Sequence, residues 1–332
     1  MQRRPLGASG LEASELSFGA MTFGEGLGPV STVPGDREAG RLVGMALDAG
    51  VNLFDTADVY GMGRSEEMLG RALGNRRDEA LVVSKVGFPV GSTPESRGLS
   101  GPRIATSVEA SLHRLGTDRI DLYLIHKRDV RTPFEETAEA LDRLVQRGLV
   151  RCVGFCNLEA WEAALALGLQ RQRGFSEFCC AQMYYSLVGR DIEGDVVPFL
   201  QHAGLGMMVW SPLAAGFLTG KYATQGAGDD TRRRDAYAYP PVDPIRGAAV
   251  LEAVRGVAER RGATFAQVAL AWVRARPGVS TVVVGASSAE QLEENLAAVH
   301  IDLDPEETAL LDAAGEPERR YPRAFYDHFP ED

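Results

Sequence analysis

The sequence predicts a (β/α)8 barrel (a TIM barrel) with an N-terminal β-hairpin, and three observations support this fold class. From residue 36 onward, short apolar runs that suit buried strands alternate with segments whose apolar residues recur at helical spacing. This alternation gives eight strand–helix units from residue 16, and no break in composition divides the 332 residues. No glycine-rich phosphate-binding turn opens an early helix, which favours a closed barrel over a doubly wound open sheet. We therefore expect one domain over residues 1–332.

The expected elements follow one another with few long gaps. Two short strands around a Gly/Ser turn at 6–11 form the hairpin. The barrel strands are expected at 16–19, 52–55, 81–85, 120–126, 150–154, 177–182, 206–210 and 281–284. Helices are expected at 36–49 (with Asp36 as its cap), 65–73, 103–115, 133–147, 158–169, 192–202, 246–261, 265–275 and 288–299.

Two segments fall outside this alternation. A long loop covers about 211–245, and loops of this length in a compact domain are more often functional, for example as a lid. An aromatic tail covers about 315–332, and it either covers the mouth of the barrel or packs on its rim. The glycine-rich loop at 22–29 leads into prolines and not into a helix, so it does not form a dinucleotide-binding turn.

Composition narrows the classes of partner. Hydrophobic residues make up 45% and charged residues 24% of the chain, which is typical of a globular protein with a substantial core. The formal net charge of -11 argues against nucleic acid or an anionic membrane as the main partner. No apolar run reaches membrane-spanning length, and the first residues lack the apolar segment of a signal peptide.

The cysteines predict neither a disulfide framework nor a metal site. Cys152, Cys156, Cys179 and Cys180 form no CxxC pair and no zinc-ligand spacing with histidine. Cys179 and Cys180 adjoin within an apolar run, which favours buried free thiols and a reducing compartment. We therefore expect a cytoplasmic protein without a bound metal.

Polar or aromatic side chains recur where the predicted strands end. They are Asp55, Lys85, His126, Gln182 and Trp210. Each has an ordinary structural interpretation: a helix cap, a solvated turn, a buried histidine or core packing. In a barrel, however, the carboxyl ends of all strands converge on one face, where active sites lie. Their recurrence at that face predicts an active site.

The residue types at this face suit proton transfer to or from a carbonyl oxygen. The phenol of Tyr60, in the loop after Asp55, has an ordinary pKa of about 10. A neighbouring ammonium on Lys85 favours the phenolate, and Asp55 keeps that ammonium charged and aimed. His126 can orient the carbonyl by a hydrogen bond or share the proton.

At this point the sequence resembles a known family. The segments 54–61 (FDTADVYG), 84–85 (SK) and 125–126 (IH) are similar to the catalytic segments of the aldo-keto reductases, and the resemblance runs from the hairpin to about Val299. It implies a (β/α)8 barrel that binds NAD(P)H in extended form without a Rossmann domain. It also implies a catalytic tetrad of Asp55, Tyr60, Lys85 and His126, with Tyr60 as the general acid.

The resemblance extends to the segments that bind the cofactor. Residues 154–157 (GFCN) resemble the family's Gly-x-Ser-Asn, which holds the nicotinamide carboxamide together with a glutamine placed like Gln182. Cys156 stands where serine is usual, and a thiol is a weak hydrogen-bond donor. Residues 210–222 resemble the potassium-channel β subunits, which implies that Trp210 lies against the nicotinamide and Lys221 near the pyrophosphate. The remaining cofactor residues implied at this end are Met21, Asp55, Asn157, Ser211, Pro212, Leu213, Gly216 and Arg232.

The adenosine end is expected after the last strand. Backbone N–H groups at a helix N-terminus favour phosphate, although a serine-capped helix with nothing bound is also common. The resemblance implies Ser287 and Gln291 near the adenosine phosphate and Glu294 and Asn295 on the adenine. Many members carry Lys and Arg where this chain has Gly285 and Gln291, so a 2′-phosphate would depend on Lys221, Ser287 and Arg232. NADP is expected over NAD.

The leading hypothesis is an NADPH-dependent oxidoreductase that reduces an aldehyde or ketone, a small-molecule carbonyl substrate. Two other hypotheses remain open. One is a Schiff-base aldolase that uses Lys85, because barrels also host that chemistry. The other is a nucleotide-sensing regulatory subunit with little turnover, suggested by the likeness to the channel subunits.

Overall fold

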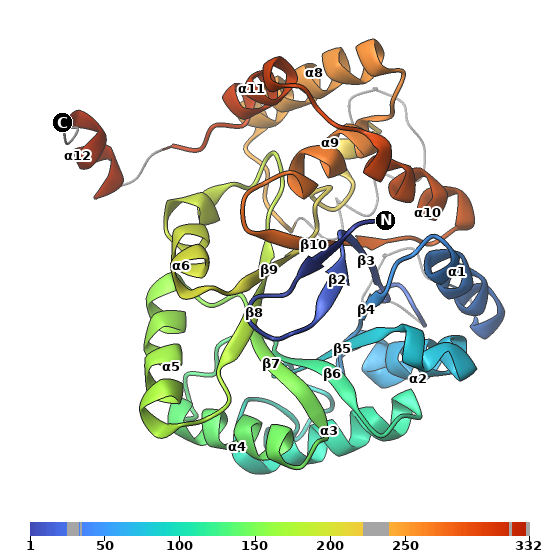
Figure 1. Ribbon diagram of the computed structural model, residues 1–332, viewed down its shortest axis with the longest axis vertical. Helices are drawn as coiled ribbons and strands as arrows, with labels where there is room; N and C mark the ends of the chain where they lie inside the picture. Colours follow the sequence, from blue (N-terminus) through green and yellow to red (C-terminus); the bar gives the residue numbers. More distant parts are fainter. Residues whose placement is uncertain (25–32, 34, 222–238, 319–320, 330–332) are drawn as a thin grey trace.

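Parallel strands close into a barrel surrounded by helices, as the sequence predicts (Figure 1). The computed structural model describes residues 1–24, 33, 35–221, 239–318 and 321–329. Within these residues the eight barrel strands pair in the order β10-β3-β4-β5-β6-β7-β8-β9, and β9 returns to β10. The strands are β3 (Leu16–Gly19), β4 (Leu53–Asp55), β5 (Leu81–Val86), β6 (Ile120–Ile125), β7 (Val150–Cys156), β8 (Phe178–Tyr184), β9 (Gly206–Trp210) and β10 (Val279–Gly285).

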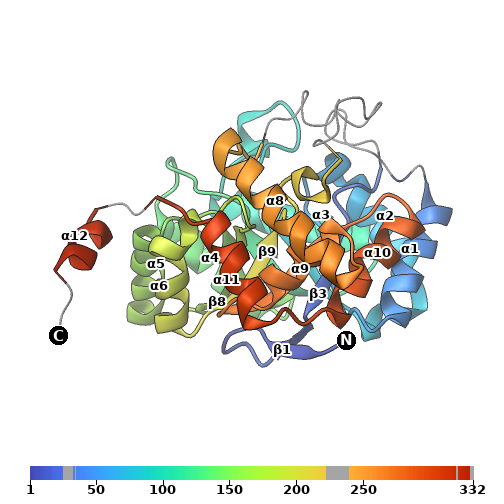
Figure 2. The same cartoon turned by 90° about the horizontal axis from the view of Figure 1, so that it is seen from above.

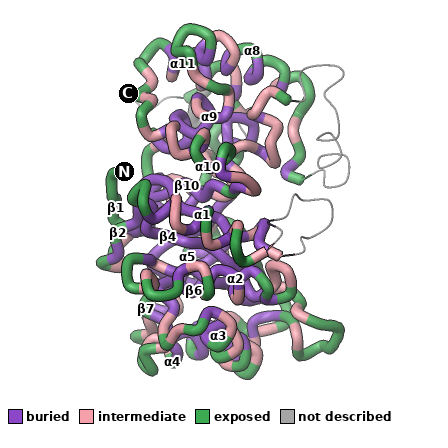
Figure 3. Tube along the Cα trace, turned by 90° about the vertical axis from the view of Figure 1, so that its right-hand side faces the viewer, coloured by how far each residue is buried: buried purple, intermediate pink, exposed green. Residues whose placement is uncertain are grey.

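Alternation along each strand divides the apolar residues between two cores. On β6, Leu122 and Leu124 point into the barrel, whereas Tyr123 and Ile125 point outward into the layer between sheet and helices. The inner core also holds Leu53 and Val83. Figure 3 shows the buried residues along the strands and the exposed ones on the outer sides of the helices. This geometry fixes which strand residues can face an active site.

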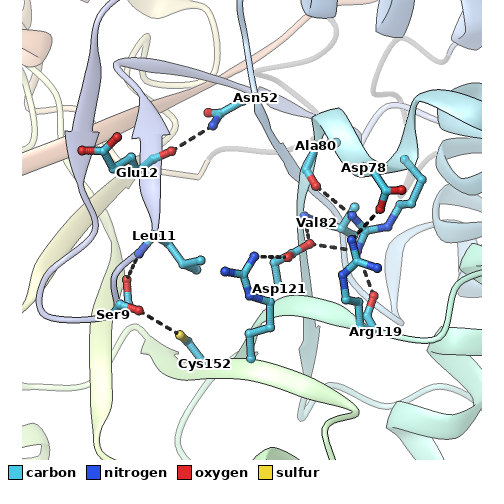
Figure 4. Close-up of polar contacts among 12 residues, drawn as sticks. Ser9, Leu11, Glu12, Asn52, Asp78, Ala80, Val82, Arg119, Asp121 and Cys152 are labelled. Carbon is cyan, nitrogen blue, oxygen red and sulfur yellow. Dashed lines mark hydrogen bonds and ion pairs between the residues drawn. The ribbon is translucent and has the colours of Figure 1, made fainter.

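The hairpin closes the amino end of the barrel. Its strands β1 (Arg3–Pro5) and β2 (Glu12–Ser14) pair antiparallel, and its apolar side chains Leu6, Leu11 and Ala13 pack into the inner core. The side chain of Asn52 ties the hairpin to the barrel: its Nδ2 donates to Glu12 O at 2.8 Å and its Oδ1 accepts from Ser14 N at 2.7 Å. Figure 4 shows the contact between Asn52 and Glu12 at this end. The opposite, carboxyl end remains available for chemistry.

The helices cover the outside of the barrel. They are α1 (Asp36–Asp48), α2 (Arg64–Leu73), α3 (Gly101–Leu115), α4 (Phe134–Gln146), α5 (Ala160–Arg173), α6 (Val196–Ala203), α8 (Pro244–Arg261), α9 (Phe265–Arg274), α10 (Ala289–Leu296) and α11 (Pro305–Ala314). A further helix, α12 (Arg323–His328), belongs to the C-terminal tail. In the described part of the chain, no helix combines the length and apolarity needed to cross a membrane.

Several expected bounds are shifted by one to four residues, and three larger features also differ from the expectation. Gly35, not Asp36, is the cap of α1; Asp36 is the first helical residue, and its carboxylate accepts two hydrogen bonds from Arg71 of α2, at 2.9 and 3.0 Å. Helix α11 was not expected. The aromatic tail contains α12, which stands apart from the barrel in Figures 1 and 2, with Phe325 and Phe329 exposed. Helix α12 therefore lies away from the mouth of the barrel, whereas Gly315, at the start of the tail, is buried.

Candidate active site

A buried lysine lies at the centre of the site. Asp55 ends β4 and Lys85 lies one residue before the end of β5, so both side chains enter the barrel at its carboxyl end. The Lys85 ammonium Nζ donates to Asp55 Oδ2 at 2.7 Å, to Thr56 O at 2.8 Å and to Tyr60 OH at 3.3 Å. Lys85 is 0% exposed. Three acceptors thus hold one buried cation in a fixed direction.

The charge on Lys85 survives its burial. Burial lowers the pKa of this ammonium, but the Asp55 carboxylate and the Tyr60 phenol raise it by more, so the pKa lies above its ordinary value. Lys85 is therefore a fixed positive charge beside the phenol oxygen at neutral pH. A charged amine of this kind is not a nucleophile.

A strained turn presents Tyr60 to Lys85. Residues Tyr60–Gly63 form a short 3-10 turn in which Gly61, Met62 and Gly63 have φ angles of 55°, 54° and 94°. A left-handed conformation is unfavourable for Met62, which has a Cβ and an exposed side chain. The strain is confined to the residues that immediately follow Tyr60.

The phenol of Tyr60 keeps its proton at neutral pH. Burial raises the pKa of Tyr60 to about 12, and the opposing effect of Lys85 is smaller. The expectation that Lys85 loosens this proton is thus right about the direction of the lysine's effect and wrong about the net shift, because desolvation is the larger contribution. A protonated phenol directed by an ammonium is suited to donate a proton.

His126 follows β6 and forms a wall of the site. Its ring lies edge-on to Tyr60 at 5.7 Å and to Phe88 at 4.7 Å between centroids. Burial, reinforced by the charges of Lys85 and Lys127, lowers the pKa of His126 well below its ordinary value. Its Nδ1 atom is buried and has no hydrogen-bond partner in the described residues. A neutral imidazole can donate one hydrogen bond to a bound group.

Amide side chains lie next to this cluster. Gln182 on β8 donates from Nε2 to Asp55 Oδ1 at 2.6 Å, and the thiol of Cys156 lies 4.0 Å from Gln182 Oε1. Asn157, with φ 56°, donates from Nδ2 to His126 O at 3.2 Å and accepts from Trp210 Nε1 at 3.1 Å. Two amides and a partly exposed indole on adjacent strand ends fit a planar carboxamide-bearing ring.

The loop after β9 continues from this point. Ser211, Ala214, Ala215 and Gly216 all have positive φ angles, between 49° and 88°, so the backbone coils tightly just beyond Trp210. Pro212 and Leu213 lie inside this coil, and Leu213 O accepts from the N–H groups of residues 216 and 218. Lys221 follows at its exposed end. Arg232 lies outside the described residues.

A separate group surrounds the start of α10. Gln291 Oε1 accepts from Ser287 N and Ser287 Oγ, both at 2.9 Å, while Ser288 caps the helix. Asn295 Nδ2 donates to Gly285 O at 3.3 Å. The carbonyl of Ala286 accepts from Thr22, the neighbour of Met21, at 3.2 Å, and Glu294 lies half-buried on α10. These residues follow β10 and so share the carboxyl end of the barrel with the tetrad.

The structure adds residues that the sequence did not single out. Phe88 contacts His126, Tyr184 contacts Trp210 at 5.3 Å and Tyr239 stacks on Trp210 at 6.1 Å between centroids. Phe88 comes three residues after Lys85, a position from which a mouth residue could have been expected. Tyr239 belongs to the long loop. Its contact with Trp210 depends on the course of that loop, which the local sequence pattern does not predict.

Comparison with known proteins identifies the family. The model of the "Aldo/keto reductase family" matches residues 15–316. The chain is 36% identical over 323 residues to "Uncharacterized oxidoreductase YrpG" of Bacillus subtilis (strain 168), across 94% of this chain and 95% of that protein. It is 34% identical over 313 residues to a "Probable voltage-gated potassium channel subunit beta" of Arabidopsis thaliana, and equally to one of Oryza sativa subsp. japonica, across 91% of this chain and 92% of each relative. The chain therefore belongs to the aldo/keto reductase family.

Proposed function

We propose that this protein is an NADPH-dependent oxidoreductase of the cytoplasm that reduces an aldehyde or ketone to an alcohol. The observation that carries the proposal is the chain of contacts from Asp55 through Lys85 to the hydroxyl of Tyr60, at 2.7 and 3.3 Å. These contacts bring a half-buried, protonated phenol beside a fixed cation at the carboxyl end of the barrel. Family membership supports the oxidoreductase class.

Each residue of the tetrad has a distinct part in the proposed reaction. Tyr60 donates the proton of its hydroxyl to the carbonyl oxygen as that oxygen gains negative charge. Lys85 stabilises the phenolate that remains, because the ammonium lies within hydrogen-bond distance of the phenol oxygen. Asp55 holds Lys85 charged, and His126, as a neutral donor, orients the carbonyl oxygen. When bound, the nicotinamide supplies the hydride.

Four neighbouring residues would hold the nicotinamide. Asn157 and Gln182 supply amide groups for the carboxamide, Trp210 supplies an aromatic face, and Cys156 supplies only a weak donor. The group at Gly285, Ser287, Gln291, Glu294 and Asn295 would bind the adenosine end, and Lys221 with Arg232 would supply positive charge for phosphate. This distribution of charge favours NADP over NAD.

The alternatives are weaker on physical grounds. A Schiff-base aldolase needs a neutral amine, whereas the carboxylate of Asp55 holds Lys85 as an ammonium. A regulatory subunit is suggested by the names of the plant relatives, which describe probable subunits of voltage-gated potassium channels. The tetrad contacts that are in place here favour turnover over sensing alone.

Cofactor consumption with a carbonyl panel tests the proposal. Purified protein is mixed with NADPH or NADH and with aliphatic aldehydes, aromatic aldehydes and ketones, while cofactor absorbance is followed and the alcohol product is identified. We expect turnover with at least one aldehyde and a preference for NADPH. Tight NADPH binding without turnover on any carbonyl would support the sensing subunit instead.

A further inference from the structure

A buried ionic cluster lies behind the active site, on the outer side of β5 and β6. It consists of Asp58, Glu66, Arg103, Arg114 and Tyr123, and it is packed between the barrel wall and helices α2 and α3. Glu66, which is fully buried, accepts from Ser84 Oγ at 2.5 Å and from Arg114 Nε at 2.7 Å. None of these groups faces the barrel interior, so the proposed reaction does not use them directly.

Asp58 is the unusual member of this cluster. Its Oδ2 accepts from Arg103 Nη2 at 2.7 Å and from the more distant Ser107 Oγ at 3.5 Å, and the residue is only 1% exposed. Its Oδ1 and the hydroxyl of Tyr123 are buried without a hydrogen-bond partner in the described residues. Burial raises the pKa of Asp58 to about 7, and Arg103 opposes this rise. A buried carboxylate with one unpaired oxygen lowers the stability of the folded protein.

The backbone connects Asp58 to the tetrad. Its N–H donates to Lys85 O at 3.3 Å, and two residues later the N–H of Tyr60 donates to Ala57 O at 3.1 Å. The Lys85 ammonium in turn donates to Thr56 O at 2.8 Å. The segment from Thr56 to Tyr60 is therefore held to Lys85 at its backbone, with the Asp58 side chain anchored behind the wall and the phenol in front.

We propose that Asp58, gripped by Arg103 of α3, is a positioning residue that sets the location of the Tyr60 hydroxyl relative to Lys85. This inference rests on the proposed function, in which Tyr60 is the proton donor. The ion pair fixes the middle of this five-residue segment, whose last residue, Tyr60, opens the strained turn that continues through Gly61 and Met62. Without the pair, that turn can relax and withdraw the phenol from the ammonium.

Asp121 provides a matched control. It is also a carboxylate that is 1% exposed, and it lies near the amino end of strand β6. It accepts from two arginines, Arg77 Nη2 at 2.8 Å and Arg151 Nη1 at 2.9 Å, so both of its oxygens have partners. Figure 4 shows Asp121 among its polar partners, near the hairpin at the amino end of the barrel. Asp121→Asn thus perturbs a buried carboxylate that pairs with arginine without touching the Tyr60 segment.

The first measurement is the single-turnover rate of hydride transfer from prebound NADPH to a carbonyl substrate. We expect Asp58→Asn to lower this rate by about tenfold or more, because small misplacements of a reacting group slow the reaction strongly. The Kd for NADPH, measured separately by titration, should stay within about twofold of wild type. Asp121→Asn should change the rate by less than about twofold, although it weakens contacts with two arginines. Equal effects of the two substitutions would overturn the proposal.

The second measurement does not depend on turnover. Tyrosine ring resonances are recorded with 13C label at Cζ, and Tyr60 is assigned by its loss in Tyr60→Phe. We expect the Tyr60 resonance to shift in Asp58→Asn and to stay in place in Asp121→Asn. An unshifted Tyr60 resonance in Asp58→Asn refutes the positioning role, whereas absence of turnover in the wild type refutes only the proposed reaction.

Arg103 gives an independent pair of variants should Asp58→Asn fail to fold. Arg103→Met removes the cation and Arg103→Lys retains it, although lysine lacks the planar fork of arginine. We expect Arg103→Met to shift the Tyr60 resonance and slow hydride transfer as Asp58→Asn does, and Arg103→Lys to lie closer to wild type. Equal behaviour of the two arginine variants, with Tyr60 unmoved in both, would contradict the proposal.

Discussion

Replacing Asp55 by asparagine tests the electrostatic centre of the site through protein stability. The substitution keeps the shape of the side chain but removes its negative charge. Among the described residues, Asp55 is the only carboxylate to which Lys85 Nζ donates a hydrogen bond. Lys85 is 0% exposed, so the variant must hold a buried ammonium without its counter-charge. Breaking a buried pair in this way costs about 3–5 kcal/mol of unfolding free energy.

The effect should depend on pH in a defined direction. In the wild type the folded pKa of Lys85 lies above the unfolded value of 10.5, so the contribution of the pair is fully present below pH 10.5 and is lost at higher pH. In Asp55→Asn, the carboxylate no longer offsets the effect of burial, so the pKa of Lys85 in the folded protein falls below 10.5. The variant therefore gains stability as pH rises toward 10.5. The difference in unfolding free energy between wild type and Asp55→Asn should be largest near neutral pH and should become smaller toward pH 10.

Urea unfolding at several pH values between about 6 and 10 measures this difference. The double variant Asp55→Asn/Lys85→Met is the control, because it removes both charges and should be more stable at neutral pH than Asp55→Asn alone. The reasoning would be refuted if Asp55→Asn were less stable than wild type by under about 1 kcal/mol at every pH. That result would mean that Lys85 is solvated or neutral in the folded protein.

Two further predictions concern the cofactor and the helix packing. Cys156→Ser places a stronger hydrogen-bond donor near Gln182 and should tighten NADPH binding by about 1 kcal/mol, roughly fivefold in Kd. A fluorescence titration measures this change, and weaker binding would show that the thiol is preferred. Gly70→Ala should destabilise the protein by about 1–3 kcal/mol in urea unfolding, because the new Cβ would lie 2.3 Å from Leu115 O. Gly40→Ala, on the open side of α1, should instead stabilise it by about 0.5–1 kcal/mol. Equal effects of the two alanines would contradict the packing argument.

The fold was predictable because its signals are local and repeated. Each unit carries an apolar run and a helical apolar stripe, so the eight strands of the described barrel appear in the expected order. The carboxyl-end location of Asp55 and Lys85 followed from the strand limits alone. The hairpin followed from its Gly/Ser turn, and β1 pairs with β2 as expected.

The differences arise where packing overrides local pattern. Asp36 has the residue type of a helix cap, but an ion pair with Arg71, distant in sequence, takes its carboxylate. Helix α11 did have a signal, since Asp304 and Glu307 form a capping box around Pro305. The raised pKa of Tyr60 and the burial of Asp58 depend on neighbours from several elements, which spacing in the sequence does not show.

The central claim is that Tyr60 donates the proton, and the most direct test is hydride transfer in Tyr60→Phe. The substitution removes the hydroxyl that lies 3.3 Å from Lys85 Nζ and keeps the ring. The single-turnover rate with a carbonyl substrate that the wild type reduces is compared with the Kd for NADPH measured on the same preparations. The account predicts a rate at least about a hundredfold lower with an unchanged Kd, because general acid catalysis contributes about 10²–10⁴-fold. A rate close to that of the wild type, with NADPH bound as tightly, would contradict it.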